Sequence, residues 1–303
     1  MVRRDKLQHF PERFPVACQW EITCRCNLHC VMCYTDCFNR PDLIREELTT
    51  PDMLRIMDEM ADAGTLELCL TGGEPMMRPD FFQLYEHAIR CGFLVTVFTN
   101  GTLITEAAAD RFAALRPHRI EISLHGLTRE TYERITQGTG SYQRCLDSIG
   151  LLVDRQVPLT LKSTAMTLNQ HEILAIKQYV ASLGSVSYKL GEEMRPELDG
   201  GGGPFHYALS EGDLRILNQQ DDDLWKESCQ QLRTELSPCR SGMQRFHIDA
   251  HGKLQLCSGN RRHTYDLRNG SFREGFFKAM PTFACEWKAP VASEPKRPSV
   301  SHA

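Results

Sequence analysis

The chain has 303 residues, of which 41% are apolar and 24% are charged, with a formal net charge of −4 at pH 7. This is the composition of an ordinary globular protein with one large or two modest domains. The small negative charge leaves no basic surface for nucleic acid. No apolar run is long enough to span a membrane, and the polar N-terminal residues lack the apolar core of a signal peptide. We therefore expect a cytoplasmic protein that binds neither nucleic acid nor membrane.

Thirteen cysteines are present. In a long chain without a signal peptide they indicate metal or redox chemistry instead of disulfides. Cys26, Cys30 and Cys33 follow residues 16–23, which mix apolar and β-branched side chains and predict a first strand. Their spacing lets one tight loop, residues 24–34 (the cysteine loop), turn three thiols toward a common centre with a fourth position left open. Thiolates select zinc or iron–sulfur clusters over hard cations, and the spacing alone allows both.

A second motif follows the next predicted strand. Residues 49–52 (TTPD) begin a helix with a capping hydroxyl, a proline at the first position and an acid in the first turn, and Gly64 ends it. Residues 66–70 predict a strand that runs into residues 71–75 (TGGEP). The two adjacent glycines let the backbone approach a ligand closely, and Glu74 offers an acceptor for an ammonium group.

The chain then alternates strands and helices up to residue 190. We expect strands at residues 93–99, 119–124, 158–164 and 185–190, and helices at 80–91, 106–115, 128–136, 142–155 and 171–183. Such alternation implies a parallel sheet with right-handed crossovers, and ligands collect at the carboxyl ends of its strands. The polar residues at or near these ends are the three thiols, Glu74, Asn100, Ser123 and Lys162.

These motifs resemble those of the radical S-adenosylmethionine (SAM) enzymes. The CxxxCxxC signature of that family matches Cys26, Cys30 and Cys33, and its GGEP motif matches residues 72–75. The resemblance implies an α/β fold, a partial (β/α)6 TIM-like barrel over residues 14–199 after a lead-in at residues 1–13. It also implies that the three cysteines bind three irons of a [4Fe–4S] cluster while SAM chelates the fourth.

The same resemblance implies which residues bind SAM. Gly72, Gly73 and Glu74 would hydrogen-bond its amino group, and Asn100 and Ser123 would contact its ribose or carboxylate. Met32 stands where the family more often has an aromatic residue, and it is still apolar and adenine-sized. Lys162 would place a charge near the substrate or the SAM carboxylate.

The residues by themselves leave simpler roles open. Ser123 is equally a hydroxyl that caps a backbone group, and His125 is interpreted as a loop residue that forms hydrogen bonds. Cys69, Cys91 and Cys145 fall inside predicted strands or helices, so we interpret them as small buried apolar residues.

A second region begins after the glycines at residues 200–203, which predict a flexible joint. Ser210, with Asp213 three residues later, predicts a helix N-terminus. Residues 245–249 and 253–257 alternate apolar and polar side chains around residues 250–252, which predicts a hairpin.

The cysteines of this region resemble those of the SPASM and twitch extensions of radical SAM enzymes, which hold auxiliary iron–sulfur clusters. The resemblance implies one small iron–sulfur extension over residues 200–287 (the extension), with Cys239, Cys257 and Cys285 as ligands and Cys229 as a possible fourth. A structural zinc or free thiols remain the alternatives. Beyond it, residues 288–303 are rich in Pro, Ser and Ala, so we expect a disordered tail.

The resemblance also implies a reaction: reductive cleavage of SAM to a 5′-deoxyadenosyl radical that abstracts hydrogen from a substrate. Residues 122–128, 131–136 and 140–142 look like those of SPASM-type peptide maturases, so we expect maturation of a ribosomally made peptide. A reductant such as flavodoxin or ferredoxin would be required, and a separate protein would bind the leader peptide. Two alternatives stay open: an enzyme of tetrapyrrole, cofactor or other small-molecule biosynthesis, and a zinc-binding protein without catalysis.

Overall fold

A computed structural model of the chain describes residues 13–235 and 241–285. The predicted tail at residues 288–303, the lead-in up to residue 12 and Cys239 lie outside the described residues.

Six parallel strands form the centre of the molecule. They are β1 (Ala17–Thr23), β2 (Glu67–Gly72), β3 (Leu94–Thr99), β4 (Arg119–Ser123), β5 (Leu159–Thr164) and β6 (Ser187–Gly191). Their order in the sheet follows their order in the chain, with β6 at one edge. The predicted α/β fold with a partial barrel of six parallel strands is confirmed.

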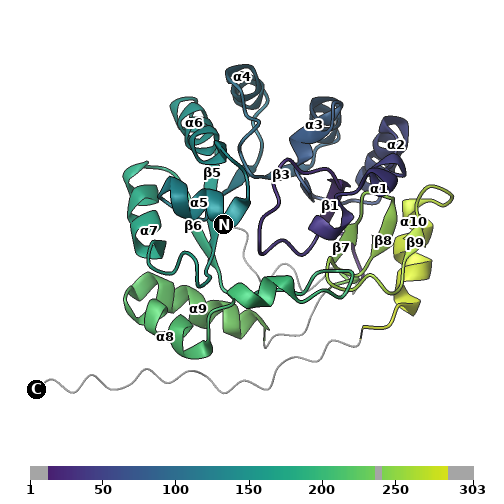
Figure 1. The fold of residues 1–303 in the computed structure, drawn as a ribbon. Helices are drawn as coiled ribbons and strands as arrows, with labels where there is room; N and C mark the ends of the chain where they lie inside the picture. Colours follow the sequence, from purple (N-terminus) through teal and green to yellow (C-terminus); the bar gives the residue numbers. More distant parts are fainter. Residues whose placement is uncertain (1–12, 236–240, 286–303) are drawn as a thin grey trace, which may run out of the picture.

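The helices of this region are α1 (Pro41–Arg45), α2 (Thr50–Asp62), α3 (Phe81–Arg90), α4 (Glu106–Ala114), α5 (Arg129–Thr136), α6 (Ser141–Asp154) and α7 (Ile173–Ser182). Most of them cover the outer face of the sheet. In Figure 1, α2, α3, α4, α6 and α7 form an arc around the strands, and the cysteine loop (dark purple) lies inside that arc. Within the described residues, no helix is long and apolar enough to cross a membrane.

Local chemistry explains why α2 forms where it does. The Thr49 side chain accepts a hydrogen bond from Asp52 N, as the sequence predicts for a helix cap. Met53, Ile56, Met57 and Met60 recur at helical spacing, and each is fully buried. Alternate strand residues such as Ile120 and Ile122 complete this core. The opposite face of the strands is left to polar side chains.

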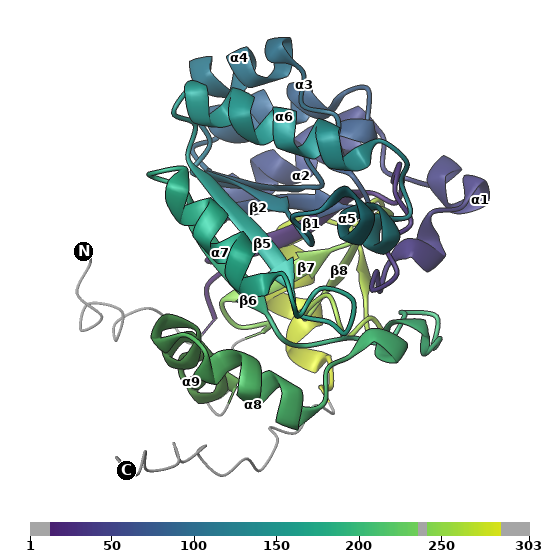
Figure 2. The same ribbon diagram turned by 60° about the vertical axis from the view of Figure 1, so that its left-hand side comes forward.

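The extension adds to both edges of the sheet. Its elements are α8 (Glu211–Gln219), α9 (Asp222–Glu235), β7 (Arg245–Ile248), β8 (Lys253–Gln255), β9 (Tyr265–Asp266) and α10 (Phe272–Glu274). Short turns of other helix types lie at Asp36–Phe38 (η2), Pro75–Met77 (η3), Gly203–Tyr207 (η4), Gly275–Ala279 (η5) and Met280–Thr282 (η6). In Figures 1 and 2, α8 and α9 lie on the side of β6 and α7, whereas β7 to β9 follow β1.

The predicted hairpin is confirmed, because β7 and β8 pair antiparallel. The sequence did not indicate its place in the sheet. β7 pairs parallel with β1, with Ala17 opposite Arg245 and Trp20 opposite Ile248. The extension therefore continues the barrel sheet instead of forming a sheet of its own.

Candidate functional site

The cysteine loop is held in place by hydrogen bonds from Asn39 and from the end of α5. Asn39 brackets Cys26, since its Oδ1 accepts from Cys26 N (3.3 Å) and its Nδ2 donates to Cys26 O (3.0 Å). The backbone N–H groups of His29 and Val31 donate to carbonyl oxygens at the end of α5, at 3.1 and 2.9 Å. Sequence reasoning did not find Asn39, because nothing in its local pattern separates it from an ordinary loop residue.

The three predicted thiols lie together on this loop. A tight turn joins two of them, with Cys33 N donating to Cys30 O at 2.9 Å, and Met32 lies half-buried within that turn. Burial raises the pKa of Cys26 to about 12 and that of Cys30 well above its usual range. Such thiols are neutral by themselves and ionise when a metal centre supplies positive charge.

The spacing of these sulfurs tests which metal centre they fit. A single tetrahedral zinc, with Zn–S bonds of about 2.3 Å, requires sulfurs about 3.8 Å apart. Within the described residues, Cys26, Cys30 and Cys33 do not form a group ready to hold a single ion as their side chains now stand. Three thiols on one loop with a fourth position open fit the all-thiolate frame of an iron–sulfur cluster.

Gly72 and Gly73 bring the end of β2 against the start of the cysteine loop. Gly73 N donates to Thr23 O (2.9 Å), and Glu74 N donates to Arg25 O (2.6 Å). A Cβ atom at either glycine would lie 2.2 Å from a carbonyl oxygen, that of Thr23 for Gly72 and that of Arg25 for Gly73. Both positions therefore require glycine, because the GGE turn (residues 72–74) and the cysteine loop pack backbone against backbone.

Glu74 is fully buried and holds the end of β3. Its carboxylate accepts from Thr99 Oγ1 (2.8 and 2.9 Å), Asn100 N (2.7 Å) and Met76 N (3.1 Å). Burial raises the pKa of Glu74 to about 7, although these hydrogen bonds favour the ionised form. A carboxylate has about four acceptor positions, and these three donors leave room for one further donor.

The Asn100 side chain connects β3 to the cysteine loop. Its Nδ2 donates to Asn27 Oδ1 (2.9 Å), and its Oδ1 accepts from the backbone and hydroxyl of Thr102 (2.8 and 2.7 Å). Asn27 Nδ2 closes the ring by donating to Thr102 Oγ1 (2.8 Å). The cysteine loop, the GGE turn and the end of β3 are thus joined by hydrogen bonds into one unit.

Ser123 and Lys162 lie opposite each other in register on β4 and β5. Lys162 Nζ lies 3.2 Å from Glu121 Oε2 and 3.8 Å from the ring centroid of Phe98. Lys189 Nζ donates to the other oxygen of Glu121 at 2.6 Å. Burial would raise the pKa of Glu121, but the two lysines lower it. Glu121 therefore has three cations around it, because Arg119 Nη1 also lies 3.8 Å from Glu121 Oε1.

His125 is a buried loop residue that forms hydrogen bonds, as the sequence predicts. Its Nδ1 accepts from Thr164 N (3.2 Å), and its carbonyl oxygen accepts from Asn169 Nδ2 (2.9 Å). Burial lowers its pKa to about 4, so the ring is neutral at pH 7.

A second buried ion group joins β1 to the extension. Glu21 Oε1 lies 3.3 Å from His247 Nε2 on β7 and accepts a hydrogen bond from Arg261 Nη2 in the segment after β8. Burial would raise the pKa of Glu21, but His247 and Arg261 overcome this effect and lower it to about 2. No sequence motif revealed this group, because its members come together only when β7 pairs with β1.

The extension cysteines are less closely connected. Cys257 lies half-buried after β8 and Cys285 is exposed. Asn260, which pairs with Cys257 across a short bridge, donates to Ala284 O at 3.4 Å, so the two segments meet. Cys229 lies on α9. Cys239, the remaining predicted ligand, lies outside the described residues.

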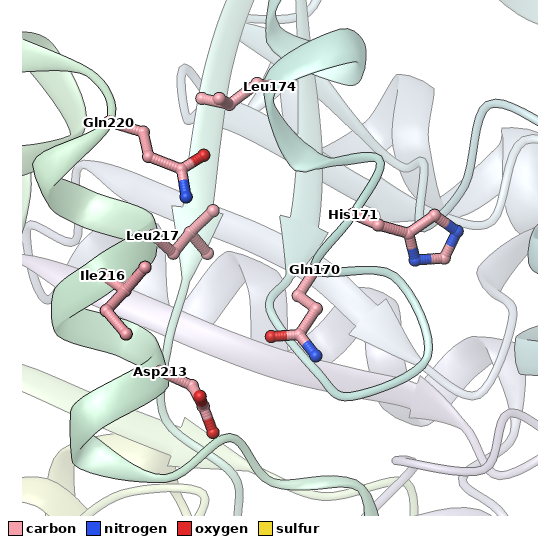
Figure 3. Close-up of a pocket in the computed structure, with 7 residues that line it drawn as sticks. All are labelled: Gln170, His171, Leu174, Asp213, Ile216, Leu217 and Gln220. Atoms are coloured by element: carbon pink, nitrogen blue, oxygen red, sulfur yellow. The ribbon is translucent and has the colours of Figure 1, made fainter.

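The surface of the described residues has two hollows of note. One, of about 410 Å³, lies beside the cysteine loop and is lined by Arg25 together with residues 49–51 and 78–80. The other, of about 220 Å³, lies between α8 and the start of α7 (Figure 3). Its lining residues are Gln170, His171, Leu174, Asp213, Ile216, Leu217 and Gln220. None of these is a predicted site residue, so the second hollow is separate from the candidate site.

Comparisons with known proteins identify the family of this chain. The profile of the Radical SAM superfamily matches residues 20–180. The chain is 32% identical over 169 residues to an AdoMet-dependent heme synthase from Methanosarcina barkeri. This match covers 56% of this chain and 48% of that protein. The chain is also 33% identical over 162 residues to a PqqA peptide cyclase from Rhizobium meliloti, which covers 52% and 42%. The chain thus spans about half the length of the curated relatives it matches.

Solved structures share the fold. Streptococcus suis SuiB bound to its precursor peptide SuiA matches with a TM-score of 0.72 at 16% identity, over 88% of this chain and 65% of that one. The structure of anSMEcpe with bound AdoMet matches with a TM-score of 0.66 at 15% identity, over 88% and 81%.

Proposed function

Because the chain belongs to the radical SAM superfamily, we propose that it reductively cleaves SAM and uses the resulting radical to mature a ribosomally made peptide. The observation that carries the proposal is the backbone contact between the GGE turn and the cysteine loop. This contact fixes Cys26, Cys30, Cys33 and Glu74 relative to one another, which is what a site that binds cluster and SAM together requires.

In this proposal the chain binds and orients the two cofactors. Cys26, Cys30 and Cys33 would hold a [4Fe–4S] cluster, which would pass one electron from the reductant to SAM and so supply a 5′-deoxyadenosyl radical with methionine as the leaving group. Gly72, Gly73 and Glu74 receive the amino group of SAM, the Glu74 carboxylate through its remaining acceptor position. Asn100 and Ser123 are assigned to the ribose and carboxylate, and Met32 to the adenine.

We assign the extension, residues 200–287 after a barrel of residues 14–199, to one auxiliary cluster. Its ligands would be Cys239, Cys257 and Cys285, with Cys229 as a fourth. The contact between Asn260 and Ala284 supports the pairing of the segments that carry Cys257 and Cys285. A low-potential reductant such as flavodoxin or ferredoxin and a separate leader-binding protein complete the proposed system.

A peptide substrate is favoured by the relatives. Their names include a peptide cyclase and a maturase, and one structural neighbour holds a precursor peptide. The heme synthase relative favours a second candidate, a reaction on a tetrapyrrole. Lys162 and Lys189, which share the single carboxylate of Glu121, suit an anionic group on either substrate.

The first experiment is anaerobic iron and sulfide analysis of the reconstituted protein, followed by a dithionite assay for 5′-deoxyadenosine with SAM alone. Product with about eight irons supports both clusters, and product with about four supports the barrel cluster alone. Zinc without iron, and no product, would refute the proposal. A change in mass of a peptide encoded beside the gene, or of a tetrapyrrole precursor, then separates the two candidates.

A further inference from the structure

Asp58, His87 and Cys91 form a group of potential metal ligands on the outer helical layer. Their ligand atoms all lie within 4.8 Å of one another, and no other three His, Cys, Asp or Glu side chains in residues 13–235 and 241–285 do so. His87 Nε2 lies 2.7 Å from Asp58 Oδ1, and Cys91 Sγ lies 3.5 Å from the same oxygen. One carboxylate oxygen therefore faces both an imidazole nitrogen and a thiol.

The fold explains how these residues meet. α2 carries Asp58, and α3 carries His87 in its last turn with Cys91 as its C-cap. Residues four apart lie on the same face of a helix, so the imidazole and the thiol point the same way. From the sequence we expect Cys91 to be a small buried apolar residue. In the structure it is partly exposed, at the C-terminal end of α3.

The distance between Cys91 and Asp58 suits one tetrahedral ion. With metal–sulfur and metal–oxygen bonds of about 2.3 and 2.0 Å, a tetrahedral centre separates sulfur and oxygen by about 3.5 Å. The distance from Cys91 Sγ to Asp58 Oδ1 is 3.5 Å. In such a centre, His87 Nε2 and Asp58 Oδ1 would lie about half an ångström farther apart than their present distance of 2.7 Å. The Asp58 side chain is 58% exposed and free to make that movement.

The local charges also favour a cation. Asp62 lies one turn beyond Asp58 on α2 and adds a second carboxylate near Cys91, while Arg90 opposes both. Burial, and after it the Asp58 carboxylate, raise the pKa of the Cys91 thiol to about 11. A divalent ion would replace the thiol proton, since a metal-bound cysteine is a thiolate.

We propose that Asp58, His87 and Cys91 bind one zinc-class divalent ion, with water as the fourth ligand. A thiolate, an imidazole and a carboxylate with one open position form a donor set of the zinc type. The ion would fasten α2 to α3, the helices that follow the cysteine loop and the GGE turn in the chain. It would also contribute one zinc per chain that has no connection with the cysteine loop.

The test uses the anaerobically reconstituted protein and zinc chloride. Equilibrium dialysis with metal analysis should show one bound zinc per chain and an unchanged iron content. His87→Ala and Cys91→Ser should each weaken this binding by more than about tenfold, since losing even an outer-shell partner costs 10- to 100-fold. His171→Ala is the matched control, because His171 also lies beside a carboxylate, that of Glu172 at 3.6 Å, and should leave zinc binding unchanged.

Alkylation gives a readout that does not depend on mutant folding. In the unaltered protein, saturating zinc should slow the reaction of Cys91 with iodoacetamide, as followed by peptide mass spectrometry, and chelation should restore it. Zinc binding that persists in both variants, or a Cys91 alkylation rate that zinc leaves unchanged, would overturn the proposal. Neither result depends on SAM cleavage, so the proposed function is tested separately.

Discussion

The cysteine loop and the cysteines of the extension differ in what brings their thiols together. Cys26, Cys30 and Cys33 are close in the chain, and hydrogen bonds from Asn39, α5 and the GGE turn fix their loop. Cys257 and Cys285 are far apart in the chain, and a 3.4 Å hydrogen bond from Asn260 to Ala284 joins their segments. A site built by local spacing can be predicted from sequence, whereas one built by long-range contacts depends on the fold.

Replacing one thiol of the cysteine loop gives the largest expected effect. Cys30→Ala removes one of the three proposed iron ligands, so we expect complete loss of 5′-deoxyadenosine formation with dithionite and SAM. Iron that belongs to the extension should remain. Retained SAM cleavage in Cys30→Ala would refute the assignment of the loop.

Replacing a cysteine of the extension should have a smaller effect. Cys257→Ser and Cys285→Ser should each lower the iron content by about one cluster. Both variants should still cleave SAM in the assay that contains no substrate. Cys145→Ser, at a buried thiol on α6, serves as the control. If the iron content of all three variants equals that of the unaltered protein, the extension holds no cluster.

The connection between the two regions can be broken at Glu21. Arg261→Ala leaves a buried carboxylate with His247 alone, and breaking a buried ion pair costs about 3–5 kcal/mol. The Glu21 pKa lies below its ordinary value, at about 2, so its stabilising effect is present above its unfolded pKa and disappears as the pH falls through 2. In Arg261→Ala, the contribution of Glu21 to the free energy of unfolding should begin to fall at a higher pH. Urea unfolding between pH 7 and pH 3 measures this change.

An exposed arginine on α8 of the extension provides the control for this prediction. Arg215→Ala should change the free energy of unfolding by no more than about 0.5 kcal/mol. Equal losses for Arg261→Ala and Arg215→Ala would mean that the buried pair with Glu21 does not stabilise the contact between barrel and extension.

Local signals in the sequence were sufficient for most of the barrel. The caps at Thr49 and Ser210, the methionine face of α2 and the six parallel strands are all confirmed. Each depends on residues a few positions apart. Cys26, Cys30, Cys33 and the GGE turn could be found for the same reason, although the need for glycine at 72 and 73 arises from the neighbouring backbone.

Contacts across long stretches of chain could not be predicted. The pairing of β7 with β1 has no local signal, and without it Glu21, His247 and Arg261 do not meet. Asp58 and Cys91 are likewise brought together by the packing of α2 on α3. Spacing rules describe one segment at a time, so they miss sites that two distant segments share.

Glu74 provides the smallest and most specific test, because it distinguishes a residue that binds SAM from one that only holds β3. Its pKa is raised to about 7 by burial, so the neutral carboxyl stabilises the fold at low pH and that contribution disappears as the pH rises through 7. The ammonium of SAM favours the ionised form and reverses this preference. SAM affinity of the unaltered holoprotein should therefore increase from pH 6 to pH 8.

Glu74→Gln should remove this pH dependence and weaken SAM binding about tenfold at pH 8, since a hydrogen bond to a charged group contributes about 1.5–3 kcal/mol. Thr99→Val is the matched control: it removes a donor to the carboxylate but keeps the charge, so the increase in affinity should remain and shift to higher pH. Calorimetric titration with SAM at pH 6, 7 and 8 measures all three proteins. The same pH dependence in Glu74→Gln would mean that the carboxylate acts on the backbone of Asn100 and not on the ligand, which would leave the cluster thiols as the part of the barrel site that holds SAM.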